Sequence, residues 1–258
     1  MLRVITLLLV ALSVSAAPVT LEQMRKEPRI AMVVANGAYD KSPLSHADRE
    51  GKRMRAFLEK AGFEVLYGEN LDRRGFISLL REFTLKSEPD GVALFYYFGH
   101  AFQHGGKNYL LPLDATIMRA GDVRFQAIEL NAVLGKLEKR ANRTFISVME
   151  TAFPNPPTGA FTPEKAGLAP ITLEKSSYFL SARPGRTAAN GELTRRFVQA
   201  MQTPGISLEQ GKRYLDASSA PSRTPLMHTG PEPFYFFLPK QLSETEREPI
   251  VEPIRSFG

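Results

Sequence analysis

The residues best suited to acid–base chemistry follow two short apolar runs. His100 comes shortly after the run Val92–Tyr97. An imidazole has an unperturbed pKa of about 6.5 and exchanges protons near neutral pH. His100 is therefore a candidate base, although a histidine that only hydrogen-bonds its own loop would look the same. Glu150 directly follows the second run, 144–149, and a lone carboxylate there is as readily a capped or solvated group as a site residue.

The nucleophiles and metal ligands available to this chain are limited by its composition. The 258 residues include no cysteine, which excludes disulfides, thiolate metal sites and a cysteine nucleophile. The four histidines are His46, His100, His104 and His228. Only His100 and His104 are close in sequence, and no group of carboxylates accompanies them. We therefore expect neither a metal site nor a cofactor.

Alternating strands and helices are predicted to position these residues. The expected strands cover 29–35, 63–67, 92–97, 144–149, 177–181 and 233–238, with a short extended piece at 108–112. The expected helices cover 46–61, 72–83, 128–139, 193–201 and 208–215. Because the strands are continuously apolar, they indicate an α/β fold with a mainly parallel sheet covered on both faces. Ligands bind beyond the carboxyl ends of such strands, where His100 and Glu150 are placed.

Several segments, in the same order, resemble the bacterial caspase-like and metacaspase-like peptidases. Residues 92–114, which include ALFYYFGHA and NYLLPLD, resemble the family's histidine segment. Residues 30–39, IAMVVANGAY, resemble its first strand, and 145–156 align with its cysteine segment. The likeness continues through 182–185, 190–197 and 224–237, and so runs from about 29 to 238. The resemblance implies a caspase-like three-layer fold, with a sheet of about six strands and helices on both faces.

The chain departs from the family at the nucleophile. The family's Asp-Ala-Cys is replaced by Glu150, Thr151 and Ala152, so that Ala152 occupies the nucleophile position beside the retained His100. A methyl group cannot perform covalent catalysis. We therefore predict a catalytically inactive pseudopeptidase that serves as a peptide- or protein-binding or regulatory module. The alternative is a hydrolase that uses Thr151 with His100; Ser147, inside the predicted strand, is less suited.

The resemblance implies that other parts of the family's site are retained. The oxyanion hole would be formed by the backbone N–H groups of Ala101, which replaces a glycine, and Ala152. Glu50, which follows Arg49, and Glu150 occupy positions that resemble the acidic substrate pocket of metacaspase-like members. The expected partner is a peptide or protein with basic side chains, recognised by paired hydrogen bonds. Two unrelated surface acids would give the same pattern.

The ends and the overall charge give further expectations. Residues 1–17 resemble a signal peptide, with a basic start, an apolar run at 4–14 and small residues at 15–17, although an uncleaved anchor is an alternative. We expect export to the periplasm or secretion, a caspase-like domain over 28–240 and a loose tail over 241–258.

The net charge is +6, but no block of like charges occurs, which favours a solvated surface over nucleic-acid binding.

Overall fold

The computed structural model describes residues 19–140, 143–188, 191–217, 225–231 and 233–239. The predicted signal peptide, 1–17, and the predicted tail, 241–258, lie outside these ranges. Within them, no helix is both long and apolar enough to cross a lipid bilayer.

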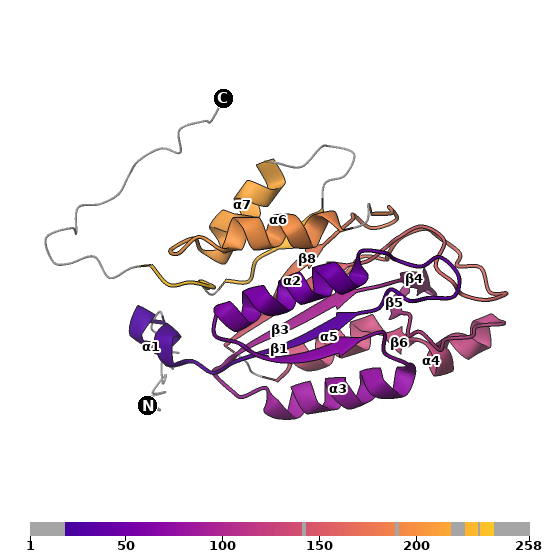
Figure 1. The fold of residues 1–258 in the computed structure, drawn as a ribbon, viewed down its shortest axis with the longest axis horizontal. Coiled ribbons are helices and arrows are strands. Elements are labelled where there is room, and N and C mark those ends of the chain that lie inside the picture. The colour runs from indigo at the N-terminus through magenta and orange to yellow at the C-terminus, as the bar shows by residue number, and fades with distance from the viewer. Residues whose placement is uncertain (1–18, 141–142, 189–190, 218–224, 232, 240–258) are drawn as a thin grey trace, which may run out of the picture.

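A six-stranded sheet forms the centre of the fold (Figure 1). Its strands, in spatial order, are β2 (Glu64–Glu69), β1 (Arg29–Ala35), β3 (Val92–Phe98), β7 (Thr144–Glu150), β8 (Ser177–Leu180) and β9 (Leu226–His228). The first five strands are parallel, and β9 is antiparallel to β8. The prediction of a mainly parallel sheet of about six strands is confirmed.

Helices cover both faces of this sheet. One face carries α2 (Ala47–Lys60), α6 (Glu192–Met201) and α7 (Leu208–Ala217), and the other carries α3 (Arg73–Lys86) and α5 (Leu130–Glu138) (Figure 1). Alternate residues of β3 point to opposite faces, so Tyr96 joins the core under α2 while Tyr97 joins the core over α3. Every residue of β3 is therefore buried. The three-layer prediction is confirmed.

A small antiparallel sheet follows His100 and turns the chain away from β3. It consists of β4 (Ala101–His104), β5 (Lys107–Leu110) and β6 (Ile128–Glu129). The turn between β4 and β5 is Gly105–Gly106, and both residues have positive φ, as tight hairpin turns require. The helix predicted from 128 begins at Leu130, because Ile128 and Glu129 pair with β5. The 3₁₀ helix η1 (Ala120–Asp122) and the short helix α4 (Val123–Gln126) connect β5 to β6.

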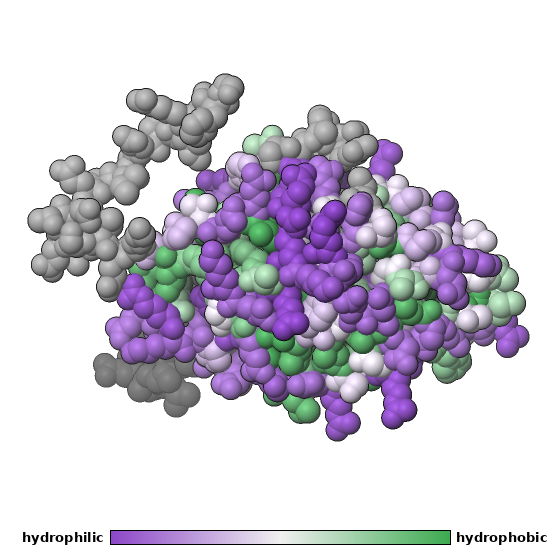
Figure 2. Space-filling model, in the orientation of Figure 1, coloured by the Kyte–Doolittle hydropathy of each residue, from purple (hydrophilic) through white to green (hydrophobic). Residues whose placement is uncertain are grey.

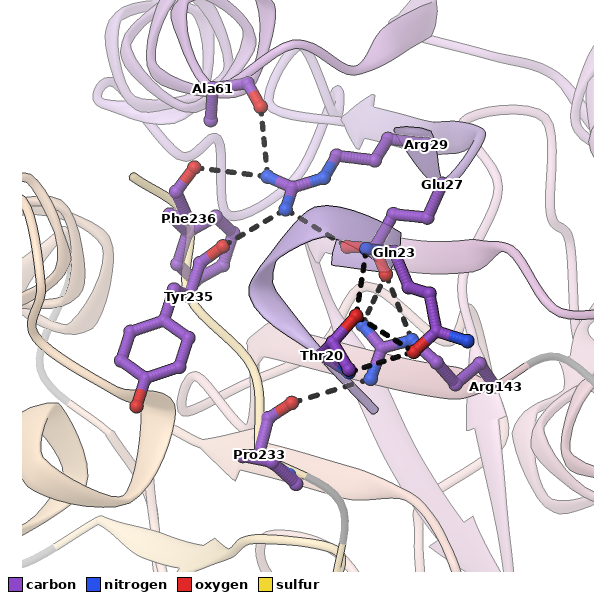
Figure 3. Close-up of polar contacts among 9 residues, drawn as sticks. All are labelled: Thr20, Gln23, Glu27, Arg29, Ala61, Arg143, Pro233, Tyr235 and Phe236. Atoms are coloured by element: carbon purple, nitrogen blue, oxygen red, sulfur yellow. Dashed lines mark hydrogen bonds and ion pairs between the residues drawn. The ribbon is translucent and has the colours of Figure 1, made fainter. Parts of the chain in front are cut away.

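The predicted strand at 233–238 is wrong. Most of its carbonyls accept hydrogen bonds from arginine side chains and from a loop rather than from a neighbouring strand (Figure 3). Arg29 donates to the carbonyls of Tyr235 and Phe236, and Arg143 donates to that of Pro233. The backbone N–H groups of Leu208 and Gly205 donate to the carbonyls of residues 234 and 237. Aromatic rings of the segment pack on α2 and α6, and its one strand-like contact among the described residues is an isolated bridge between Tyr235 and Ser207.

The first helix, α1 (Leu21–Lys26), was not predicted. Thr20 caps it, since its hydroxyl accepts from the backbone N–H of Gln23 while the Gln23 side chain accepts from the N–H of Thr20. Its last turn leads to Glu27, which lies between Arg29 and Arg143 (Figure 3).

Candidate functional site

His100 lies between β3 and β4, and its backbone is held from both sides. Its N–H donates to the hydroxyl of Tyr39 at 3.2 Å. Its carbonyl accepts from the hydroxyl of Tyr97 at 2.9 Å and from the N–H of Leu111 at 2.9 Å. The residue is only 1% exposed. These contacts fix the position of the candidate base.

The imidazole of His100 is held in one tautomer. Its Nε2 lies 2.7 Å from the carbonyl oxygen of Ser42. A carbonyl only accepts, so Nε2 carries the proton and Nδ1 holds the lone pair. Nδ1 has no hydrogen-bond partner among the residues that the structure describes. Burial lowers the pKa of His100, which keeps the ring neutral and Nδ1 able to accept a proton.

Two aromatic rings lie around the imidazole. The Tyr39 ring meets the imidazole edge-on with 4.9 Å between centroids, and the Phe153 ring does so at 6.0 Å. Phe153 also packs on Phe98 at 5.3 Å. Sequence reasoning gave Phe153 no role at the site. Its apolar character directly after Ala152 was the available signal.

Ala152 lies close to His100 because β3 and β7 are neighbours. In their register Phe98 is opposite Glu150, so His100 and Ala152 follow two paired strand ends. Ala152 is 2% exposed, and its carbonyl accepts from the N–H of Ala188 at 3.0 Å. Its own N–H donates to no acceptor among the described residues. The nucleophile position therefore offers a methyl group and a backbone N–H that no acceptor in the described part of the chain uses.

Backbone strain is concentrated around His100. Within the described ranges, five residues other than glycine have positive φ, and three of them are Asn or Asp, which tolerate it. The other two are Ser42, at 56°, and Ala152, at 65°. The carbonyl of Ser42 accepts the hydrogen bond from Nε2 of His100, and Ala152 occupies the nucleophile position. A left-handed conformation costs such residues about 1–2 kcal/mol, and strain of this kind clusters at functional sites.

The alternative nucleophiles are directed elsewhere. The hydroxyl of Thr151 donates to the carbonyl of Gly99 at 2.6 Å, and its N–H donates to Ser181 Oγ at 3.0 Å. The Thr151 hydroxyl is thus engaged with Gly99 rather than with His100. Ser147 is buried within β7, before the strand reaches the site, and its hydroxyl has no partner among the described residues.

Glu150 caps a helix. Its carboxylate accepts from the N–H of Leu193 at 3.0 Å, from the N–H of Thr194 at 2.9 Å and from the Thr194 hydroxyl. These amides are among the unpaired donors of the first turn of α6, where negative charge is favourable. Burial raises the pKa of Glu150, and the bonds from Thr194 and Leu193 oppose that rise. Both carboxylate oxygens are therefore committed to α6.

Glu50 reaches the same end of α6 from α2. It is 1% exposed, and a Cβ placed on Gly191, the residue before α6, would lie 3.7 Å from its Cγ. Its two oxygens lie 2.9 Å from Arg49 Nε and 3.0 Å from Arg53 Nε. The structure thus brings the two predicted pocket acids to one helix end, each with partners from its own chain.

The remaining candidates lie in different surroundings. Ala101 is buried at the start of β4 and shares a core cluster with Ala152. The other histidines are apart: His46 precedes α2, His104 pairs with a glutamate, and His228 stacks on a tyrosine of β8. Among the described residues, no three or more potential ligands are grouped as a metal site.

Comparisons with known proteins identify the fold and the family. The model of the caspase domain family matches residues 28–208. A crystal structure of a Geobacter sulfurreducens protein is similar with a TM-score of 0.57 at 10% identity, covering 79% of this chain and 94% of that one. The Drosophila initiator caspase Dronc is similar with a TM-score of 0.56 at 11% identity, covering 84% and 86%. No curated protein matched. Because the family match spans more than half of the sequence, the chain belongs to the caspase domain family.

Proposed function

We propose that this protein is a catalytically inactive caspase-like domain that binds a peptide or protein partner. The observation that carries the proposal is that Ala152, whose side chain is a methyl group, occupies the nucleophile position. Ala152 follows β7, and His100 follows the neighbouring strand β3. Covalent catalysis needs a nucleophile within hydrogen-bond reach of the base. The whole sequence contains no cysteine that could be brought there.

Hydrolysis through Thr151 is less well supported. The Thr151 hydroxyl is buried and donates to the carbonyl of Gly99. To attack a substrate it would have to break this bond and turn toward His100. An active enzyme would use Nδ1 of His100, which has no partner among the residues that the structure describes, as its base. The hydrolase alternative is therefore tested below with variants of His100 and Thr151.

A binding role is supported by the groups that remain at the site. The N–H of Ala152, which has no acceptor within the described ranges, is a donor suited to a carbonyl oxygen of an extended peptide. Glu50 supplies a buried negative charge near the start of α6. Paired, charge-assisted hydrogen bonds to such a carboxylate favour basic side chains. We propose a partner segment that carries a basic residue.

We also propose export of the protein, on the basis of the signal-like residues 1–17. N-terminal sequencing of the protein from fractionated cells tests this directly. Cleavage near Ala16 or Ala17 in an exported fraction is expected. An intact Met1 in the cytosol would contradict export without affecting the proposed binding role.

Peptidase and binding assays on the full chain test the proposed function. We expect no cleavage of fluorogenic Arg or Lys peptides by the wild type, and calorimetric binding of an Arg peptide that weakens in Glu50→Gln. Cleavage that disappears in both His100→Ala and Thr151→Val would establish the hydrolase instead. Equal affinity of wild type and Glu50→Gln would reject the basic-residue site.

A further inference from the structure

The candidate site is closed by its own chain. His100 is 1% exposed, Ala152 is 2% exposed, and Phe153, the next residue, is 3% exposed. Nδ1 of His100 and the N–H of Ala152 have no hydrogen-bond partner in the described part of the chain. Both groups can therefore bind a ligand, but a ligand reaches them only if a covering group moves away.

Phe153 is the covering group that packing alone holds. The hydroxyl of Tyr39, the other ring beside the imidazole, donates to the carbonyl of Leu111 at 2.7 Å and accepts from the N–H of His100 at 3.2 Å. The Phe153 ring has no polar atom, and its centroid lies 5.3 Å from that of Phe98 and 6.0 Å from that of the imidazole. Tyr39 is thus fixed by directional bonds, whereas the Phe153 ring can leave without breaking one.

Few hydrogen bonds hold the segment 153–157, which carries this ring. Residues 153–155 make no hydrogen bond within the described ranges. The chain is anchored before the segment, where the carbonyl of Ala152 accepts from the N–H of Ala188 at 3.0 Å. It is anchored again after the segment, where the N–H of Phe161 donates to the carbonyl of Ile117 at 3.1 Å. A segment with so few bonds between two anchors opens locally at a low cost in free energy.

The backbone of this segment can rotate at Ala152 and Asn155. Residues 154, 156 and 157 are prolines, whose rings fix φ. Ala152 and Asn155 have positive φ, 65° and 53°. Hinges are loop or element-terminal residues that absorb large changes in φ and ψ. A rotation at Ala152 relieves its strained conformation and moves the proline-rich segment as a stiff unit.

Burial nevertheless favours the closed position of Phe153. The ring belongs to the core cluster under α2, and the surface over α2 is strongly hydrophilic (Figure 2). A ring that leaves this core enters water unless a partner covers it. Burial of a phenylalanine side chain favours the closed position about ten- to a hundredfold, so the open state is a minor population.

We propose that the segment 153–157 is a lid, that the Phe153 ring closes it over His100, and that a partner enters the site only when the lid opens. The closure itself needs no ligand, whereas the use of the opened site by a partner rests on the proposed function. A peptide that binds only the open state has its affinity reduced by the fraction of open molecules. A lid that no longer closes should therefore strengthen its binding.

Chemical labelling of histidines in the full-length protein tests the lid without a ligand. Diethyl pyrocarbonate acylates neutral imidazoles, and peptide mass spectrometry reports each of the four histidines separately. Phe153→Ala should raise the labelling rate of His100 about ten- to a hundredfold, and Phe153→Leu, which keeps an apolar side chain, should raise it less. The matched control is Phe161→Ala, which removes another ring between β7 and β8 that lies 5.3 Å from His104. It should leave the rate of His100 unchanged.

The wild type gives a second test, which does not depend on the folding of a variant. Because opening of a short lid exposes little surface, the labelling rate of His100 should be nearly independent of urea below the unfolding transition. A rate that rises with urea as steeply as global unfolding would overturn the lid.

The remaining outcomes separate the lid from the proposed function. The lid is rejected if His100 in folded Phe153→Ala reacts as slowly as in the wild type, or if Phe161→Ala accelerates its labelling equally. If His100 reacts as expected but no peptide binds the wild type or Phe153→Ala, the proposed function fails and the lid stands.

Discussion

Glu27 holds together two segments from opposite ends of the chain. Its side chain is 3% exposed and pairs with Arg29 and Arg143, whose side chains are 8% and 10% exposed (Figure 3). The two arginines in turn donate to carbonyls of the segment at 233–236. Burial lowers the pKa of Arg29, while the charge and hydrogen bond of Glu27 oppose that change. Removing this carboxylate leaves two buried positive charges without a counter-ion.

The cost of Glu27→Ala follows from these contacts. Breaking a buried ion pair by removing one partner costs about 3–5 kcal/mol. Arg29 keeps its bonds to the carbonyls of Ala61, Tyr235 and Phe236, so the lower end of the range, about 3 kcal/mol, is expected. In a domain of this size that corresponds to a Tm lower by roughly 6–12 °C. The variant should still fold, since domains are typically stable by about 5–15 kcal/mol.

Urea unfolding followed by circular dichroism measures this loss, and limited proteolysis should show earlier cleavage beyond 230. The control is Glu22→Ala, which removes a carboxylate from α1 that is 76% exposed and pairs with Lys26. The control should change the free energy of unfolding by less than about 0.5 kcal/mol. A loss for Glu27→Ala no larger than that of the control would refute the role assigned to the buried pair.

Three further changes test the site. Ala152→Gly relieves the left-handed backbone and should raise the free energy of unfolding by up to about 1 kcal/mol in urea; a clear loss would contradict the strain at that position. Glu150→Ala leaves the amides of Leu193 and Thr194 unpaired and should lower it by about 2–4 kcal/mol, with faster hydrogen exchange in the first turn of α6; unchanged exchange there would rule out the cap. The folded pKa of His100 lies below its unfolded value, so its contribution is present above about pH 6.5 and is lost as the pH falls. The wild type should therefore lose stability relative to His100→Gln between about pH 7 and pH 5, and a constant difference would show that the ring is not buried neutral.

The sheet was predictable because its signal is local. Residues 92–98 are continuously apolar, which only a strand covered on both faces explains at this length. The segment at 233–238 has the same aromatic, β-prone composition, and the sequence prediction therefore made it a strand. Its actual partners, Arg29 and Arg143, are distant in sequence and satisfy its carbonyls with side-chain donors. No local pattern marks such a contact.

The site was predictable in its placement but not in its contacts. His100 and Glu150 were predicted just after two strands, and the structure makes β3 and β7 neighbours, so that both residues lie at the same edge of the sheet. The prediction that Glu150 lines a binding pocket depended on its charge and on a position that resembles the family's acidic pocket. Its capping of α6 arises from a helix that begins more than 40 residues later, and three-dimensional packing decides it. The same holds for Phe153, whose ring covers the imidazole.

Substitution of Ala152 by cysteine tests the central claim most directly, that the geometry around His100 is retained and only the nucleophile is missing. The chain has no other cysteine, so thiolate absorbance at 240 nm, after subtraction of the wild type, reports this one group. If Nδ1 of His100 faces the introduced thiol, the pKa of the thiol should lie at least about one unit below its reference value of about 8.5. It should return to that value or above it in the Ala152→Cys, His100→Ala double variant. A thiol in the folded protein whose pKa is the same with and without His100 would contradict the claim.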